Sequence, residues 1–150
     1  MTVLLITALL GAVGFSLIFR MNLKYLPITS VGAIVACAVF FAADRAGFDL
    51  FASNFFAAAV ASLYSEICAR ILRAPASIFL LPCMIPLVPG GMLYYSMSHL
   101  ISHDIDGFLQ YGGEAAMTAV GIAGGMIAVS VVWSIIYKVI RSRRNRAERR

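Results

Sequence analysis

The apolar stretch at residues 76–101 contains residues that a continuous helix does not tolerate. Near its middle stand three prolines and two adjacent glycines: Pro82, Pro86, Pro89, Gly90 and Gly91. Each proline removes a backbone N–H and clashes with the preceding turn, and paired glycines loosen the chain further. We therefore predict two half-helices joined by irregular backbone.

Such a break has a chemical use in membrane proteins. Irregular backbone at membrane depth is stable only where protein covers it or where it lines a polar cavity, and transporters use such breaks as binding sites. A half-helix that begins near Pro89 would direct its N–H groups at an anionic group such as a carboxylate. The alternative is a kink that serves packing alone. We assign Pro86, Pro89, Gly90 and Gly91 to a predicted substrate site.

Two further polar side chains are candidates for the wall of that site. Tyr94 follows the break by one turn, and Asn54 lies in the apolar stretch at residues 50–71. Asn54 has two interpretations, since its amide could contact a substrate or hydrogen-bond to a neighbouring helix.

Glu66 lies about one turn inside the end of the same stretch, and Arg70 follows it by four residues. Carboxylates inside a membrane are costly and tend to be functional. One interpretation is a protonatable group that couples or gates transport. The other is an i, i+4 ion pair with Arg70 in which both side chains reach for the lipid headgroups.

Patterns for catalysis or metal binding are weak or missing. His99 and His103 have the i, i+4 spacing of some zinc sites, but no Cys or third His stands nearby. No protease, hydrolase or phosphate-loop motif occurs. Three cysteines, Cys37, Cys68 and Cys83, lie in apolar stretches without metal-ligand spacing. We predict neither an enzyme nor a metal or cofactor site.

The elements that position these residues follow from composition. The chain has 150 residues, of which 61% are hydrophobic and 13% charged, about half of the roughly 25% charged residues of soluble domains. This excludes an ordinary soluble domain, a disordered chain and a disulfide scaffold. Five apolar segments are long enough to span a bilayer, at residues 2–19, 27–43, 50–71, 76–101 and 113–140.

Loop charges predict the orientation of these segments. Eleven of the twelve Lys and Arg residues fall in the first loop, the third loop or the C-terminal tail, and only Arg45 falls in the other loops. Basic loops face the cytoplasm. We predict an all-α integral membrane protein with five transmembrane helices, the N-terminus outside and the C-terminus cytoplasmic. Residues 1–140 would form a single membrane domain, and residues 141–150 a basic tail at the lipid surface rather than on nucleic acid.

The last segment is rich in small residues. Gly121-x-x-x-Gly125 is typical of helices that approach a neighbour closely, so we expect tight packing here without knowing the partner.

Two motifs resemble one transporter family. The stretch from Glu66 to Ala76 (EICARILRAPA) and the stretch from Ile85 to Tyr94 (IPLVPGGMLY) are similar to the threonine/serine exporter family, specifically its small membrane subunit, which corresponds to the C-terminal half of the fused exporters. The resemblance implies export of threonine and serine or of a small dicarboxylate. It also implies a second membrane subunit with a cytoplasmic N-terminal region.

We therefore expect one subunit of a secondary transporter in the bacterial inner membrane that exports a small amino acid or carboxylate. Five helices are few for alternating access, which usually sets one bundle against another. A homo- or hetero-oligomer is left open. The competing hypothesis is an accessory subunit that does not transport and instead stabilises or regulates a partner transporter.

Overall fold

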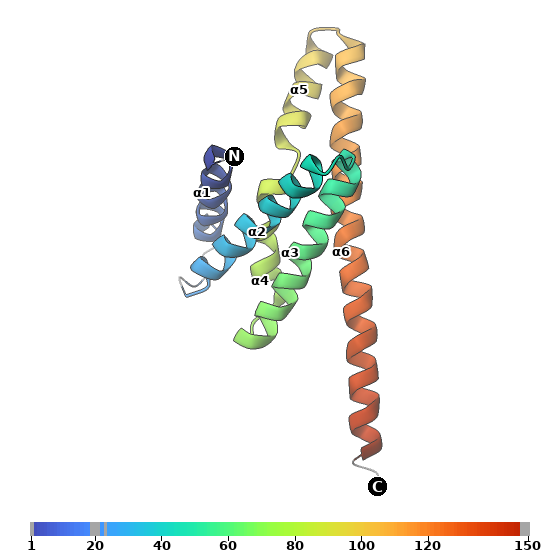
Figure 1. The fold of residues 1–150 in the computed structure, drawn as a ribbon. Helices are drawn as coiled ribbons and strands as arrows, with labels where there is room; N and C mark the ends of the chain where they lie inside the picture. The colour runs from blue at the N-terminus through green and yellow to red at the C-terminus, as the bar shows by residue number, and fades with distance from the viewer. Residues whose placement is uncertain (1, 19–21, 23, 148–150) are drawn as a thin grey trace.

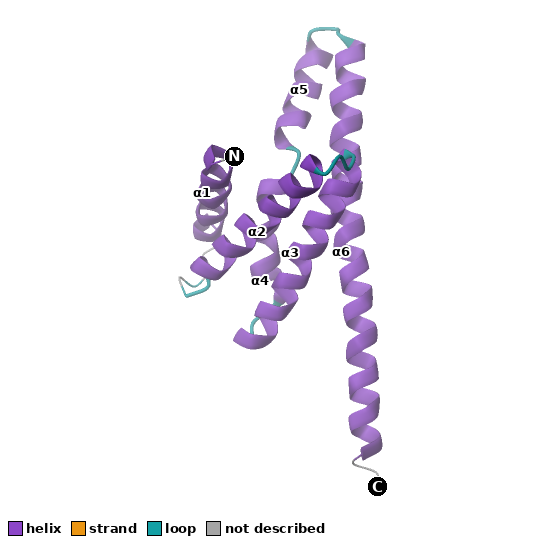
Figure 2. Ribbon diagram, viewed as in Figure 1, coloured by secondary structure: helices purple, strands orange, loops and turns teal. Residues whose placement is uncertain are grey.

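The computed structural model describes residues 2–18, 22 and 24–147, and all of its regular structure in that part of the chain is helical (Figures 1 and 2). The elements in chain order are α1 (Thr2–Ile18), α2 (Leu26–Arg45), α3 (Leu50–Leu72), α4 (Ala76–Met84), the short 3-10 helix η1 (Ile85–Leu87), α5 (Gly90–Ile101) and α6 (Ile105–Ala147).

Local sequence signals set several of these boundaries. Pro27 occupies the first turn of α2, where its missing N–H would have had no acceptor anyway. Asp49 caps α3 by accepting a hydrogen bond from the Ala52 N–H at 3.2 Å. Arg73 ends α3 in the left-handed conformation with φ 53°, which turns the chain sharply toward α4.

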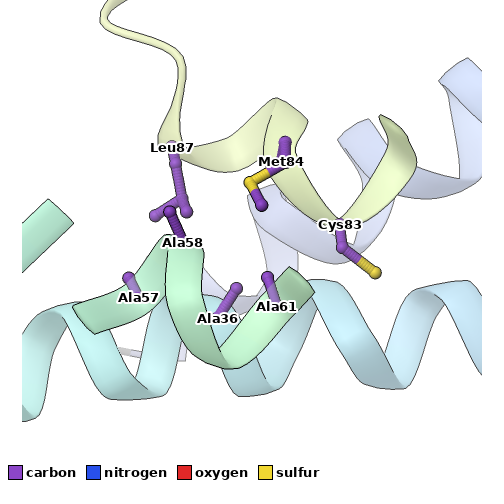
Figure 3. Close-up of a cluster of buried hydrophobic side chains, with 7 residues drawn as sticks. All are labelled: Ala36, Ala57, Ala58, Ala61, Cys83, Met84 and Leu87. Carbon is purple, nitrogen blue, oxygen red and sulfur yellow. The ribbon is translucent and has the colours of Figure 1, made fainter. Parts of the chain in front are cut away.

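The core lies where α2, α3 and α4 meet. Small side chains on α2 and α3 let the backbones approach, and larger side chains of α4 and η1 cover them (Figure 3). The buried residues of this cluster are Ala36, Ala57, Ala58, Ala61, Cys83, Met84 and Leu87. The Tyr64 hydroxyl adds a cross-link by donating to the Ile28 carbonyl at 2.8 Å.

Helix α6 packs along α3 through its glycines. A Cβ on Gly121 would lie 2.6 Å from the Phe51 carbonyl oxygen, and a Cβ on Gly125 would meet the Phe55 carbonyl and the Ala59 nitrogen. These are backbone atoms that cannot move aside. The expected close approach is therefore present, and α3 is the partner helix.

Helix α6 is longer than the apolar segment from which it was predicted. It runs for 43 residues, which at 1.5 Å per residue is about 64 Å, or roughly twice the hydrocarbon thickness of a bilayer. Its start moves from residue 113 to Ile105 because the Asp104 carboxylate accepts the Gly107 N–H at 3.1 Å and caps the helix there. Helix continues past residue 140 to Ala147; the side chains of the basic tail lie outside the described residues.

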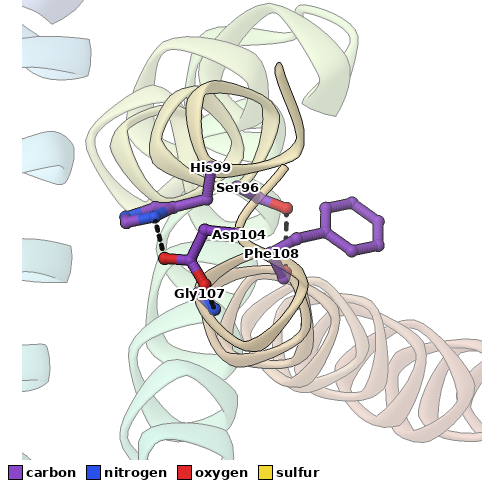
Figure 4. Close-up of polar contacts among 5 residues, drawn as sticks. All are labelled: Ser96, His99, Asp104, Gly107 and Phe108. Carbon is purple, nitrogen blue, oxygen red and sulfur yellow. Dashed lines mark hydrogen bonds and ion pairs between the residues drawn. The ribbon is translucent and has the colours of Figure 1, made fainter. Parts of the chain in front are cut away.

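The α5–α6 turn separates the two histidines that have i, i+4 spacing in the sequence. Helix α5 ends at Ile101, and His103 lies beyond it with φ 59°, so His99 and His103 do not share a helix face. Instead, His99 Nδ1 lies 2.8 Å from Asp104 Oδ2 (Figure 4). The described residues contain no group of three His, Cys, Asp or Glu side chains placed to hold a metal ion.

Helix length and apolarity give three to four membrane spans among the described residues. Helices α2, α3 and α6 each qualify alone, and the bent pair of Ala76–Leu87 and Gly90–Ile101 qualifies as one broken span. Helix α1, with 17 residues, stands at the lower end of the roughly 17–25 residues that cross a bilayer.

Candidate functional site

The predicted break is present in the fourth apolar segment. Helix α4 ends at Met84, η1 carries the chain to Leu87, Val88 is extended, and α5 begins at Gly90. The two halves meet at an angle of 49°. Pro86 and Pro89 cause this interruption, because neither supplies the N–H that would continue the α4 hydrogen-bond ladder.

A pocket of about 250 Å³ opens at this break, smaller than the roughly 300–1,000 Å³ typical of sites for drug-sized ligands. It brings together four helices and the irregular segment. Its lining residues are Phe40 of α2, Leu50 and Asn54 of α3, Pro86, Leu87, Val88 and Pro89 of the break, Gly91 and Met92 of α5, and Thr118 of α6.

The first turn of α5 borders this pocket. The Gly90 N–H bonds to the Val88 carbonyl at 2.8 Å, and the first intrahelical bond of α5 is made by Leu93 N–H to the Pro89 carbonyl. The N–H groups of Gly91 and Met92 precede that bond and have no acceptor within the helix. Both residues line the pocket, at the positive end of the helix dipole.

Two buried polar side chains complete the wall. Asn54 is 2% exposed, and its Nδ2 donates to the Leu50 carbonyl at 2.8 Å. That bond uses one of two amide hydrogens, and the amide retains a further donor besides its acceptor oxygen. The Thr118 hydroxyl, also 2% exposed, has a weak acceptor in Met92 Sδ at 3.9 Å, since a thioether sulfur accepts poorly. Both groups retain hydrogen-bonding capacity for a small polar ligand.

The structure thus gathers four of the six residues predicted for substrate binding: Asn54, Pro86, Pro89 and Gly91. Gly90 starts α5 beside them without lining the pocket. Tyr94 does not line the pocket; it is 70% exposed and its ring meets that of Tyr95 edge to face.

Glu66 and Arg70 do not line the pocket either. They lie on the last turns of α3, and twelve residues, about 18 Å of helix, separate Glu66 from Asn54. The Arg70 guanidinium sits over the Trp133 ring of α6, 4.7 Å from its centroid.

The sequence prediction missed six lining residues: Phe40, Leu50, Leu87, Val88, Met92 and Thr118. Thr118 lies in an otherwise apolar and small-residue stretch, and a single buried threonine on a membrane helix normally bonds to its own backbone. Only its distance from Met92, 26 residues away in the chain, shows that it faces the break.

Comparison with known proteins gives the family. No curated protein and no solved structure matches the chain. Residues 4–132 match the family described as Threonine/Serine exporter, ThrE. The match includes both halves of the broken helix and every residue that lines the pocket. It assigns threonine/serine exporter-type membrane transport, which is not a class of enzymes. The chain belongs to the threonine/serine exporter family.

Proposed function

We propose that this chain is a subunit of a secondary transporter that exports a small amino acid, such as threonine or serine, or a small carboxylate across the bacterial inner membrane. The observation that carries the proposal is the pocket at the broken helix. Its first-turn N–H groups suit a carboxylate, and the Asn54 amide and Thr118 hydroxyl suit a second polar group of the same ligand.

Pocket size and polarity limit the ligand class. A pocket of about 250 Å³ with apolar walls of Phe40, Leu50 and Met92 admits a small metabolite and is below the size of sites for drug-sized ligands. No Lys or Arg lines it among the residues that the structure describes, so the compensation for a carboxylate comes from backbone dipoles, as in other broken-helix sites. Small metabolites with one or two carboxylates fit this chemistry.

The proposal includes five spans with the N-terminus outside. Helix α1 supplies the fifth span, and the positive-inside pattern supplies the orientation. Figure 1 shows the C-terminal end of α3 and the C-terminal half of α6 on the same side of the molecule, as this orientation requires for Arg70, Arg73 and Lys138. The proposal also includes a second membrane subunit, because five spans are few for alternating access.

The test is export by membrane vesicles that contain this chain and its partner subunit, with radiolabelled L-threonine, L-serine and succinate as probes. Asn54→Ala should weaken substrate binding about ten- to hundredfold, since a hydrogen bond to a charged group contributes about 1.5–3 kcal/mol.

Pro89→Leu should reduce export because the leucine side chain enters the pocket. Pro82→Ala is the matched control, because Pro82 is a buried proline of α4 that does not line the pocket.

Wild-type export in the Asn54 and Pro89 variants would refute the site. Normal export by the partner subunit alone would instead make this chain the accessory subunit of the competing hypothesis.

A further inference from the structure

Helices α3 and α6 continue in contact beyond the pocket, and we call this part of their interface the α3–α6 seam. It holds two buried polar atoms without hydrogen-bond partners among the described residues. They are Ser62 Oγ on α3 and Trp133 Nε1 on α6. Ser62 is 4% exposed. Leaving a buried polar group without a hydrogen bond lowers the stability of the fold by about 1–3 kcal/mol. A bound molecule that hydrogen-bonds to both atoms would remove this cost.

Helical spacing places Glu66 beside these atoms. Ser62, Glu66 and Arg70 follow one another at intervals of four residues and therefore share one face of α3. That face meets α6 at both ends. Phe55, two turns before Ser62, contacts Gly125, and Arg70 covers the Trp133 ring at 4.7 Å. Glu66 thus lies in the row between the unpartnered hydroxyl and the indole.

The surrounding charges are all positive. Among the described residues, the charged side chains near this end of the seam are Arg70 and Arg73 on α3, Lys138 on α6, and Lys24. Lys24 precedes Tyr25, which packs against the cluster of Cys68 and Ala69. Helix α4 carries no charged residue, and the acidic residues of the helical part of α6, Asp106 and Glu114, lie near its opposite end. Glu66 is therefore the one carboxylate at this end of the seam among the described residues.

We propose that this seam is a hydrated proton-binding site, separate from the substrate pocket, in which Glu66 takes up a proton and Ser62 Oγ and Trp133 Nε1 hold the connecting water. A buried water typically makes about three hydrogen bonds. It would accept from Trp133 Nε1–H and donate to Ser62 Oγ and to the ionised Glu66. When Glu66 gains a proton from the bulk solution, its new O–H donates to the bound water, and the net charge of Glu66 and Arg70 together changes from zero to plus one.

This proposal rests on the proposed function in one respect: proton uptake would drive export only if the chain is part of a transporter. Proton binding itself is measurable without a substrate, because Trp133 is the only tryptophan of the chain. Indole emission responds to a nearby charge and to water at Nε1. The purified full chain in lipid nanodiscs should show a pH-dependent change in the intensity and wavelength of Trp133 emission, with one transition.

Glu66→Gln should abolish that transition, because glutamine keeps the shape of the side chain but cannot titrate. Glu114→Gln is the matched control and should retain it, since Glu114 is 19 residues from Trp133, or about 28 Å along α6. Ser62→Ala removes one ligand of the water and should shift the emission to shorter wavelength at every pH.

Emission that is independent of pH in the wild-type chain, or a transition that persists in Glu66→Gln, would overturn the proposal. If the Ser62→Ala chain has the same Trp133 emission as the wild-type chain, no water is bound between Ser62 and Trp133, and that part of the proposal is refuted. A transition that behaves as expected, in a protein whose vesicles do not export any of the three probes, would keep the proton site and refute the transport function.

Discussion

The Asp104 carboxylate contacts both helices that flank the α5–α6 turn. Its Oδ1 accepts the Gly107 N–H at the start of α6, and its Oδ2 lies 2.8 Å from His99 Nδ1 on α5. The hydrogen bond from Gly107 and then that from His99 hold the pKa of Asp104 below its ordinary value. Next to this turn, the Ser96 hydroxyl of α5 donates to the Phe108 carbonyl of α6 at 3.1 Å (Figure 4).

The lowered pKa of Asp104 predicts how the α5–α6 turn responds to acid. A carboxyl whose folded-state pKa is below its unfolded value contributes stability above the unfolded value, about pH 4, and loses it as pH falls through the folded value. Protection of the first-turn α6 amides against hydrogen exchange should therefore fall in acid below that range. Asp104→Asn should lower the protection at neutral pH and remove the acid dependence. Asp106→Asn, two residues on, is the control; an unchanged acid dependence in Asp104→Asn would contradict the assignment.

At the scale of elements, backbone proximity holds α3 and α6 together. Lipid tails are as apolar as leucine, so helix association in a membrane depends on close packing rather than on hydrophobic burial. Gly121 and Gly125 allow this approach because they place no atom between α6 and the carbonyls of Phe51 and Phe55. The seam of Ser62, Glu66 and Trp133 continues from the same contact.

Gly125→Ala should therefore destabilise the fold although alanine favours helix. The added Cβ would meet the Phe55 carbonyl and lie 2.9 Å from the Ala59 nitrogen, and overpacking of this kind costs about 1–3 kcal/mol. Gly113→Ala, in the same helix with open space around it, should gain up to about 1 kcal/mol of helix propensity. Thermal unfolding in detergent compares the two. Equal stability of both variants would show that the glycine contact is not required.

At the scale of the whole molecule, basic residues gather at one end of the helix bundle and acidic residues of the α5–α6 turn at the other. The C-terminal end of α3, which carries Arg70, and the C-terminal half of α6, which carries Lys138, lie on the same side of the molecule (Figure 1). The α5–α6 turn with Asp104 and Asp106 lies at the opposite end. Helix α5 packs mainly against α6 and, with the start of α6, projects beyond the α2–α3 turn in Figure 1. The pocket lies between this projecting hairpin and the α2–α3–α4 core.

This arrangement predicts which serines a membrane-impermeant maleimide can reach. Ser102 in the α5–α6 turn and Ser77 at the start of α4 are both exposed, and cysteine is close to serine in size. In intact cells, Ser102→Cys should be labelled and Ser77→Cys should be labelled only after the membrane is permeabilised. The native cysteines Cys37, Cys68 and Cys83 are buried and give a low background. The reverse labelling pattern would invert the predicted orientation.

Local rules explain what the sequence predicted correctly. Proline and glycine disrupt a helix wherever they stand, so the break after Met84 followed from the chain alone. Turn signals also placed α2 and α3 within about two residues of their observed bounds. The start of α6 was missed because the prediction followed the apolar pattern, which begins at about residue 113, whereas the cap at Asp104 lies in a polar stretch before it.

By itself, the sequence determined the class of protein, the broken helix and the end of the bundle that carries the positive charge, because hydropathy, backbone geometry and loop charge act locally. Only the tertiary structure decided that Asn54 and Thr118 meet at that break, that Tyr94 does not line the pocket there, and that Arg70 covers Trp133. The physical reason is that a membrane helix is apolar on all sides. Lipid and protein neighbours select similar side chains, so the pattern of residues does not show which face of a helix lies inward, and packing between distant segments settles it.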